Sequence, residues 1–213
     1  MESCLVWSVV ALLSCGLWAM ILTDGSVRRA VHLSLARRIG GVFSPEIIVV
    51  GDSLAASCRW TRLAGRPFGV LNLAAGGATL KEIAGQIYSA RGIEASFLLI
   101  NGGLNDLLFD AAQTDRLEED FVALTRRIDN GVTVAVTLMP FVDDVAKAQR
   151  IQAANTALSC LCRQRGYLTV DLNPSISANG VRRPDMTTDG LHFTRAADAI
   201  WVGAVQSAIS ERR

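Results

Sequence analysis

The sequence contains little net charge and only two histidines. Its 213 residues carry 21 basic and 20 acidic side chains, for a net charge of +1. A nucleic-acid-binding domain usually has a basic face or stripe, and the body of this chain has none. We therefore expect neither a nucleic acid nor another polyanion as its main partner.

The five cysteines follow no recognisable framework. Cys4 and Cys15 belong to an apolar N-terminal run, which leaves Cys58, Cys160 and Cys162 for the rest of the chain. An odd number without metal-ligand spacing argues against a disulfide scaffold and against a zinc site. We expect these three residues to be small buried side chains, and we expect no metal.

Charged residues are absent from Ser3 to Thr23. A run of this length predicts a transmembrane helix, because about 20 residues at 1.5 Å each cross the hydrocarbon of a bilayer. The alternative is a cleaved secretory signal, although no Lys or Arg precedes the run and no A-x-A site follows it. We predict residues 1–24 to be an N-terminal anchor or signal segment, and we favour the retained single-pass anchor.

Residues 25–43 are predicted to form a basic helix or linker next to the membrane. Such a helix either lies on an anionic membrane surface or packs as a linker with solvated arginines. By the positive-inside rule, the arginines after the run place the following domain in the cytoplasm. One face would carry Val27, Ala30, Val31, Ser34 and Leu35.

The remaining residues, 44–213, alternate between short apolar runs and helical patterns. Runs apolar on both faces suit a buried parallel sheet, and helices between them imply right-handed βαβ units. We therefore predict one α/β domain with three layers, α/β/α. The expected strands are 46–50, 69–73, 96–100, 132–138 and 167–170, and the helical stripes are 80–88, 117–128, 148–162 and 197–209.

Polar and glycine residues follow the predicted strands, where functional groups of such sheets gather. Ser53 comes after the first strand and a Gly-Asp pair. A serine hydroxyl is a poor nucleophile until a base removes its proton. The alternative is that Ser53 only caps a helix.

His192 is the histidine available to this domain, because His32 lies in the basic 25–43 segment. Asp189 precedes His192 by three residues, so that one turn can hold a carboxylate against the imidazole. Such a carboxylate fixes the tautomer of the base and stabilises its protonated form.

Two further residues offer donors for a developing oxyanion, which needs donors fixed in advance. Gly77 lies in a glycine pair after the second strand, and its N–H can approach a ligand closely. Asn105 offers a side-chain amide after the third strand, and the backbone N–H of Ser53 is a third donor. As alternatives, Gly77 is a plain turn glycine and Asn105 closes an Asx-turn.

Taken together, these blocks resemble the SGNH/GDSL hydrolase family, whose marker residues are Ser, Gly, Asn and His. The resemblance covers about residues 45–209, and alignment to its pattern selects Gly77 over Gly76. The blocks read Gly51-Asp52-Ser53-Leu54, then 72–79 around Gly77, then Gly103-Leu104-Asn105-Asp106, and finally Asp189-Gly190-Leu191-His192.

The resemblance implies a five-stranded flavodoxin-like sheet and hydrolysis of carboxylic or thioesters without metal or cofactor. Ser53 would form the acyl-enzyme, His192 would act as base and Asp189 would orient it, with Ser53, Gly77 and Asn105 as the oxyanion hole. An O-acyltransferase that moves acetyl groups to a glycan with the same triad is the first alternative. An inactive, membrane-tethered binding module is the second.

The expected partners are small-molecule, lipid or glycan acyl esters, together with the membrane. Family members with an N-terminal hydrophobic segment are commonly exported, which favours a periplasmic or extracytoplasmic domain and conflicts with the positive-inside rule. Leu107, Leu108 and Phe109, with Phe193, would either line an acyl pocket or pack the loops.

Overall fold

The computed structural model describes residues 25–63, 69–109, 116–129 and 131–212. The predicted anchor, residues 1–24, lies outside the described residues. Within the described ranges, no helix has both the length and the apolar character needed to cross a membrane.

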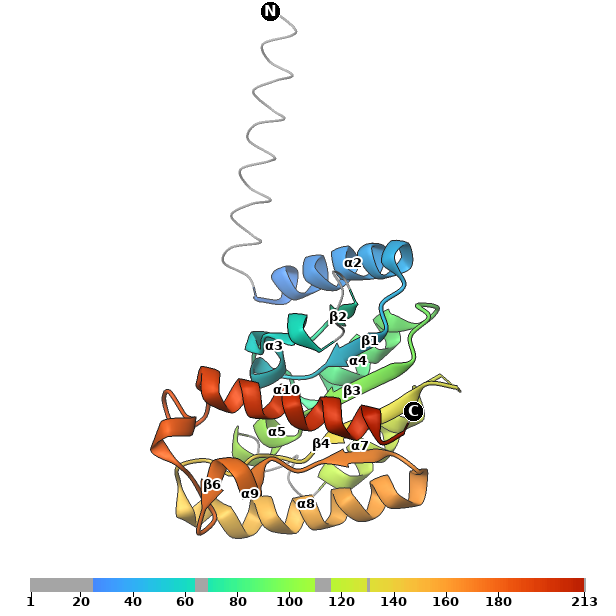
Figure 1. Cartoon of the computed structure of the whole chain (residues 1–213). Helices are drawn as coiled ribbons and strands as arrows, with labels where there is room; N and C mark the ends of the chain where they lie inside the picture. Colours follow the sequence, from blue (N-terminus) through green and yellow to red (C-terminus); the bar gives the residue numbers. More distant parts are fainter. Residues whose placement is uncertain (1–24, 64–68, 110–115, 130, 213) are drawn as a thin grey trace, which may run out of the picture.

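A five-stranded parallel sheet forms the centre of the domain (Figure 1), as predicted. Its strand order is β2-β1-β3-β4-β5, and all four pairings are parallel. Every residue of β1 and β3 is buried, as expected for strands covered on both faces. The strands are β1 (Ile47–Val50), β2 (Val70–Asn72), β3 (Phe97–Asn101), β4 (Thr133–Thr137) and β5 (Leu168–Val170).

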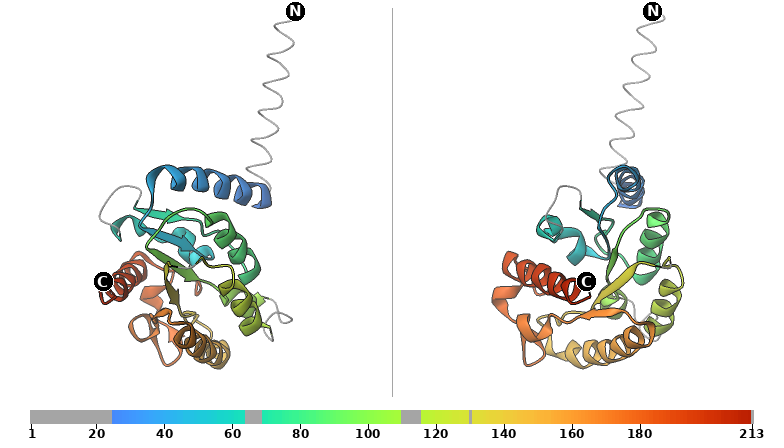
Figure 2. Two further views of the ribbon diagram at one scale, coloured as in Figure 1. Left: turned by 90° about the vertical axis from the view of Figure 1, so that its right-hand side faces the viewer. Right: turned by 45° about the vertical axis from the view of Figure 1, so that its right-hand side comes forward.

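Helices cover both faces of this sheet and complete the three layers. Figure 2 shows α4, α7 and α8 on one face and α3 and α10 on the other. The longer helices are α2 (Gly25–Phe43), α4 (Leu80–Ala90), α7 (Leu117–Thr125), α8 (Val145–Arg165) and α10 (Arg195–Ser210). The short ones are α3 (Ser53–Ser57), η1 (Trp60–Arg62), α5 (Leu104–Phe109), α9 (Asn173–Ile176) and η2 (Pro184–Met186).

Helix boundaries follow from local signals in the sequence. Thr79 and Glu82 form a capping box that begins α4. Asp144 caps the start of α8, and Gly166, in the left-handed conformation with φ 69°, ends it. Asn155 interrupts the apolar stripe of α8, yet it is only 3% exposed. Its side-chain amide accepts a hydrogen bond from the N–H of Met139, after β4, and donates one to the C=O of the same residue.

Two features differ from the sequence-based expectation. A two-stranded antiparallel sheet, β6 (Ser177–Ala178) with β7 (Val181–Arg182), follows α9 and was not predicted. The prediction for the cysteines was right for Cys58 and Cys162, which are buried, and wrong for Cys160, which is exposed. All three are free thiols.

Helix α2 packs on the edge of the domain, against β2 and α4 (Figure 1). Ala36 is buried at this contact, and a Cβ on Gly40 would lie 2.7 Å from Leu71 Cδ2. The apolar face predicted from the sequence points the other way, because Val31 and Leu35 are 41% and 58% exposed. That face therefore does not hold α2 to the domain.

Candidate active site

Ser53 is the first residue of α3, two residues beyond Gly51 at the end of β1. The turn needs glycine at position 51, because a Cβ there would lie 2.7 Å from the carbonyl oxygen of Asn101. Buried Gln86 of α4 holds the same residue, accepting from Gly51 N–H at 2.7 Å and donating to its C=O at 2.9 Å. The backbone that carries Ser53 is thus fixed from two sides.

Asp52 braces α3 and takes no part in the contacts of the Ser53 hydroxyl. Its side chain caps the helix by accepting from Leu54 N–H at 2.9 Å, and Asn101 Nδ2 donates to it at 3.3 Å. The carboxyl is 2% exposed, and this burial raises its pKa to about 6.

Residues 187–193, which we call the His192 turn, hold the acid and the base in one loop. Asp189 Oδ2 lies 2.6 Å from His192 Nδ1, and Asp189 Oδ1 accepts from the backbone N–H of His192 at 2.7 Å and of Leu191 at 3.0 Å. The backbone N–H of His192 is the largest cause that lowers the pKa of Asp189, to about 2. Asp189 is therefore ionised at neutral pH and favours an imidazole with its proton on Nδ1.

The other ring nitrogen of His192 meets Ser53, 139 residues away in the chain. His192 Nε2 lies 3.0 Å from Ser53 Oγ. With the proton on Nδ1, Nε2 is free to accept the serine proton. The His192 and Asp189 side chains are 39% and 53% exposed, so a substrate can reach them from solvent.

The three expected oxyanion donors follow β1, β2 and β3, which are neighbours in the sheet. Asn105 Nδ2 donates one hydrogen to Ala78 O at 3.0 Å, which fixes the amide and leaves its second hydrogen for a ligand. Gly77 has φ +72°, and neither its N–H nor that of Ser53 is hydrogen-bonded within the described residues. Buried Asp106 accepts from Leu80 N–H at 3.1 Å and so ties the Gly77 loop to α5.

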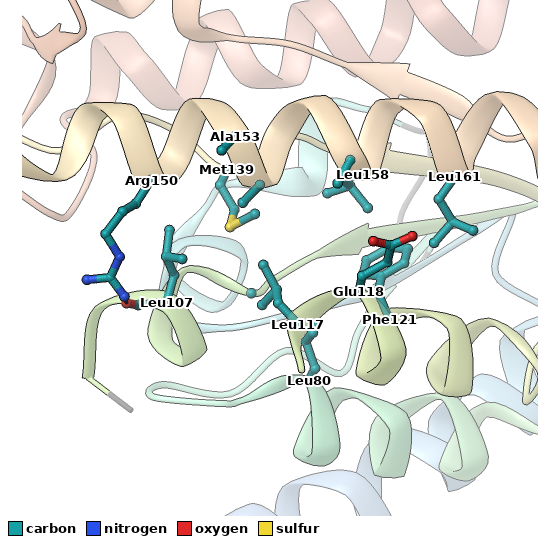
Figure 3. Close-up of a pocket in the computed structure, with 13 residues that line it drawn as sticks. Leu80, Leu107, Leu117, Glu118, Phe121, Met139, Arg150, Ala153, Leu158 and Leu161 are labelled. Carbon is teal, nitrogen blue, oxygen red and sulfur yellow. Dashed lines mark hydrogen bonds between the residues drawn. The ribbon is translucent and has the colours of Figure 1, made fainter. Parts of the chain in front are cut away.

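An apolar pocket of about 310 Å³ lies next to these loops, between α5, α7 and α8 (Figure 3). Leu107, Phe121, Met139 and Leu158 contribute to its lining, whereas Ser53, Asp189 and His192 do not. The pocket therefore lies behind the oxyanion loops and outside the reacting centre.

The residues proposed from the sequence as an acyl pocket are not gathered in one place. Leu107 lines the apolar pocket, whereas Phe109 is 71% exposed. Phe193 packs edge-on against Trp201 at 5.4 Å and below Arg182, so it supports its loop.

Several supporting residues were not predicted. Thr187 Oγ1 accepts from Gly190 N–H at 2.8 Å and donates to His192 O at 2.9 Å, closing the His192 turn. Gln86 lies on the same helix face as Ile83 and Ile87, a pattern from which its burial follows. No pattern in the sequence indicated that Arg182 is buried. Within the residues that the structure describes, no three His, Cys, Asp or Glu side chains are grouped to hold a metal ion.

Comparison with known proteins places this constellation in a family. The structure is similar to a GDSL-like lipase from Bacteroides thetaiotaomicron (TM-score 0.71, 16% identity, 87% of this chain and 100% of that one). It is also similar to a carbohydrate esterase of family 3 from Talaromyces cellulolyticus (TM-score 0.62, 18% identity, 78% of this chain and 97% of that one). A third similar structure is an acetyl xylan esterase from Geobacillus stearothermophilus (TM-score 0.61, 16% identity, 76% of this chain and 93% of that one). No curated protein shows significant similarity.

These identities are low, so the three structures establish the fold alone. The sequence itself carries the family assignment, because the model of the GDSL-like Lipase/Acylhydrolase family matches residues 49–200, well over half of the chain. That range includes Ser53, Gly77, Asn105, Asp189 and His192. The chain belongs to the GDSL-like lipase/acylhydrolase family.

Proposed function

We propose that the protein is a serine esterase that cleaves carboxylic esters or thioesters through an acyl-enzyme on Ser53. The observation that carries this proposal is the continuous contact from Asp189 Oδ2 to His192 Nδ1, at 2.6 Å, and from His192 Nε2 to Ser53 Oγ, at 3.0 Å. A nucleophile, a base and a group that orients the base are the three parts that serine hydrolysis requires.

In the proposed cycle, Ser53 Oγ attacks the acyl carbon while His192 Nε2 takes its proton. The N–H groups of Ser53 and Gly77 and the amide of Asn105 bind the oxyanion. His192 then gives the proton to the leaving alcohol, and the acyl–oxygen bond of the ester breaks. Water attacks the acyl-Ser53 ester, His192 takes its proton and returns it to Ser53 Oγ, and the free acid leaves.

The direct test is a hydrolysis screen across p-nitrophenyl esters from acetyl to palmitoyl, with Ser53→Ala as the matched control. We expect hydrolysis that depends on Ser53. Two of the similar structures are described as esterases of carbohydrates, one of them acting on acetyl xylan. Acetylated sugars are therefore the first natural ester class to add to the screen, with free acetate and acetyl transfer to a sugar acceptor measured together.

We further propose that the exposed face of α2 lies on an anionic lipid surface. Val31, Leu35 and Val42 are 41%, 58% and 75% exposed and lie within about 40° of one another around the helix. Arg28, Arg37 and Arg38 are exposed, and α2 contains no acidic residue. The uncharged run from Ser3 to Thr23 is separated from the helix by Asp24 alone, which supports attachment at the bilayer interface.

Hydrogen–deuterium exchange of the full chain in nanodiscs tests this attachment. We expect stronger protection of α2 amides with phosphatidylglycerol than with phosphatidylcholine, and loss of the difference in Leu35→Glu. Equal exchange in both lipids would contradict the proposal. A topology reporter after Arg213 distinguishes a cytoplasmic from an extracytoplasmic domain.

A further inference from the structure

Arg182 lies at the end of β7 and contacts the His192 turn. It is 1% exposed, which makes it one of the largest fully buried side chains among the described residues. Its Nη1 donates to the carbonyl oxygen of Leu191, and its Cζ lies 4.6 Å from the centre of the Phe193 ring. The guanidinium thus contacts the residues immediately before and after His192.

The buried guanidinium is only partly satisfied by hydrogen bonds. Its Nε and Nη2 have no partner within the described residues. Burial lowers the pKa of Arg182 to about 10, while the nearby carboxylates of Asp143 and Asp189 act in the opposite direction. Arg182 is therefore cationic at neutral pH, and the carboxylates of Asp143 and Asp189 are close enough to stabilise its charge. A buried charge with unused donors is costly for folding, which calls for a role other than stability.

The His192 turn needs support from the rest of the domain because the contact between its acid and its base is open to water. The Asp189 and His192 side chains are 53% and 39% exposed, and exposed ion pairs hold side chains weakly. Asp143 packs against the turn at Gly190. Its carboxylate occupies the position that a Cβ on Gly190 would take, and its backbone N–H donates to Gly190 O at 3.2 Å.

Arg182 connects the loop after β4, which contains Val142 and Asp143, to the His192 turn. Its backbone N–H donates to Val142 O at 3.0 Å, while its side chain reaches Leu191 and Phe193. One residue therefore joins the loop after β4 to both flanks of His192.

We propose that Arg182 is a positioning residue, whose buried guanidinium fixes the backbone on both sides of His192 so that Nε2 stays within hydrogen-bond reach of Ser53. This inference rests on the proposed esterase function. Displacement of a catalytic group by about 1 Å can cost about 100-fold in rate. Because Arg182 does not touch the reacting atoms, its loss affects the turnover rate and leaves substrate binding in place.

The test compares Arg182→Met, Arg182→Lys and Arg183→Met in the full chain. Methionine keeps much of the apolar volume and the contact with Phe193 but removes the charge and the bond to Leu191 O. Removing one partner of a buried charged contact usually lowers stability. The cost here is reduced because Nε and Nη2 of Arg182 have no partner within the described residues, so we expect the variant to fold. Arg183 is the matched control, because it is the next residue and its side chain pairs with Asp185, with the two side chains 40% and 64% exposed.

For Arg182→Met we expect a folded protein with a lower Tm, a kcat on p-nitrophenyl acetate that is about 100-fold lower at a temperature where the variant is folded, and a KM within about threefold of the wild type. Arg182→Lys keeps the charge without the planar fork, so we expect partial recovery of kcat. Arg183→Met should match the wild type within about twofold.

A folded Arg182→Met protein with wild-type kcat would overturn the inference. The inference would also be overturned if Arg182→Met and Arg182→Lys lost kcat equally and both unfolded, because the guanidinium would then be required for folding alone. If Arg182→Met does not fold, the kcat of Arg182→Lys tests the positioning role instead. A folded Arg182→Lys protein with wild-type kcat would also overturn the inference. The wild type and Ser53→Ala are run alongside, and a wild-type rate equal to that of Ser53→Ala would reject the esterase function itself.

Discussion

Both oxygens of Asp189 are used, and each has a different task. Oδ2 faces His192 Nδ1, whereas Oδ1 accepts two backbone N–H groups and shapes the turn. An asparagine at this position can keep the backbone bonds through its Oδ1. Its NH₂ group, however, would face Nδ1 as a donor and select the tautomer in which Nε2 carries the proton.

We therefore predict that Asp189→Asn keeps its fold and loses kcat by about 10⁴-fold, the size of effect that a wrong histidine tautomer produces in serine proteases. Steady-state kinetics and circular dichroism check the two parts. A variant with a rate within tenfold of the wild type would show that Asp189 does not orient the base.

Asp52 provides a prediction on pH and stability. Its pKa rises from 3.8 to about 6 on folding, because burial disfavours the carboxylate. The folded state therefore binds the proton more tightly than the unfolded state, and the wild type loses stability as the pH rises from below 3.8 to above 6. The change corresponds to about 3 kcal/mol.

Asp52→Asn removes the charge and keeps the cap on Leu54 N–H. We expect its stability, relative to the wild type, to be about 2 kcal/mol more favourable at pH 8 than at pH 4, because the unfolded carboxyl is already partly ionised at pH 4. Urea unfolding at the two pH values measures this difference. The same relative stability at both pH values would mean that Asp52 is not a buried carboxylate.

Among the helices and strands, those long enough to show a hydrophobic period in the sequence were predicted, and the shorter ones were missed. The predicted strand 46–50 is β1 (Ile47–Val50), and the stripe at 80–88 is α4, although Tyr88 at its end is 57% exposed. By contrast, α3, α5 and the β6–β7 pair are too short to show a period.

Among single residues, Ser53, Asp189 and His192 were predicted from their spacing and from strand ends, and the structure brings their side chains into contact. Arg182 was not, because in the sequence it is one of two adjacent arginines before a proline. Only tertiary packing distinguishes buried Arg182 from exposed Arg183. The same is true of Asn155, a polar residue in an apolar stripe, because its partner, Met139, lies in the loop after β4.

Asn155 should therefore support the attachment of α8 to the loop after β4. We predict that Asn155→Leu lowers the free energy of unfolding by about 1–3 kcal/mol, because the buried N–H of Met139 loses its acceptor, whereas Met139 O keeps the hydrogen bond from Asn173 Nδ2 at 3.1 Å. Thr156→Ala, an exposed change on the same helix, is the control and should cost less than about 1 kcal/mol. Thermal and urea unfolding measure both variants, and equal stabilities would contradict this role of Asn155.

At the scale of the whole molecule, the sheet brings together residues that are far apart in the chain. The ends of β1, β2 and β3 carry Ser53, Gly77 and Asn105, and the loop before α10 brings His192 to the same rim. Helix α2 runs opposite to β1, so that its N-terminal end lies toward this rim (Figure 1). A membrane contact along α2 would therefore bring the lipid surface near the side of the domain where Ser53 lies.

The central claim is that the Ser53 hydroxyl is activated by His192 in the folded protein. The most direct measurement is the rate at which a fluorophosphonate probe modifies the intact chain, with the modified residue identified by mass spectrometry. We predict one adduct, on Ser53, which is absent in Ser53→Ala and forms at least about 100-fold more slowly in His192→Ala. An unmodified Ser53 in folded wild-type protein, or an adduct that forms equally fast without His192, would contradict it.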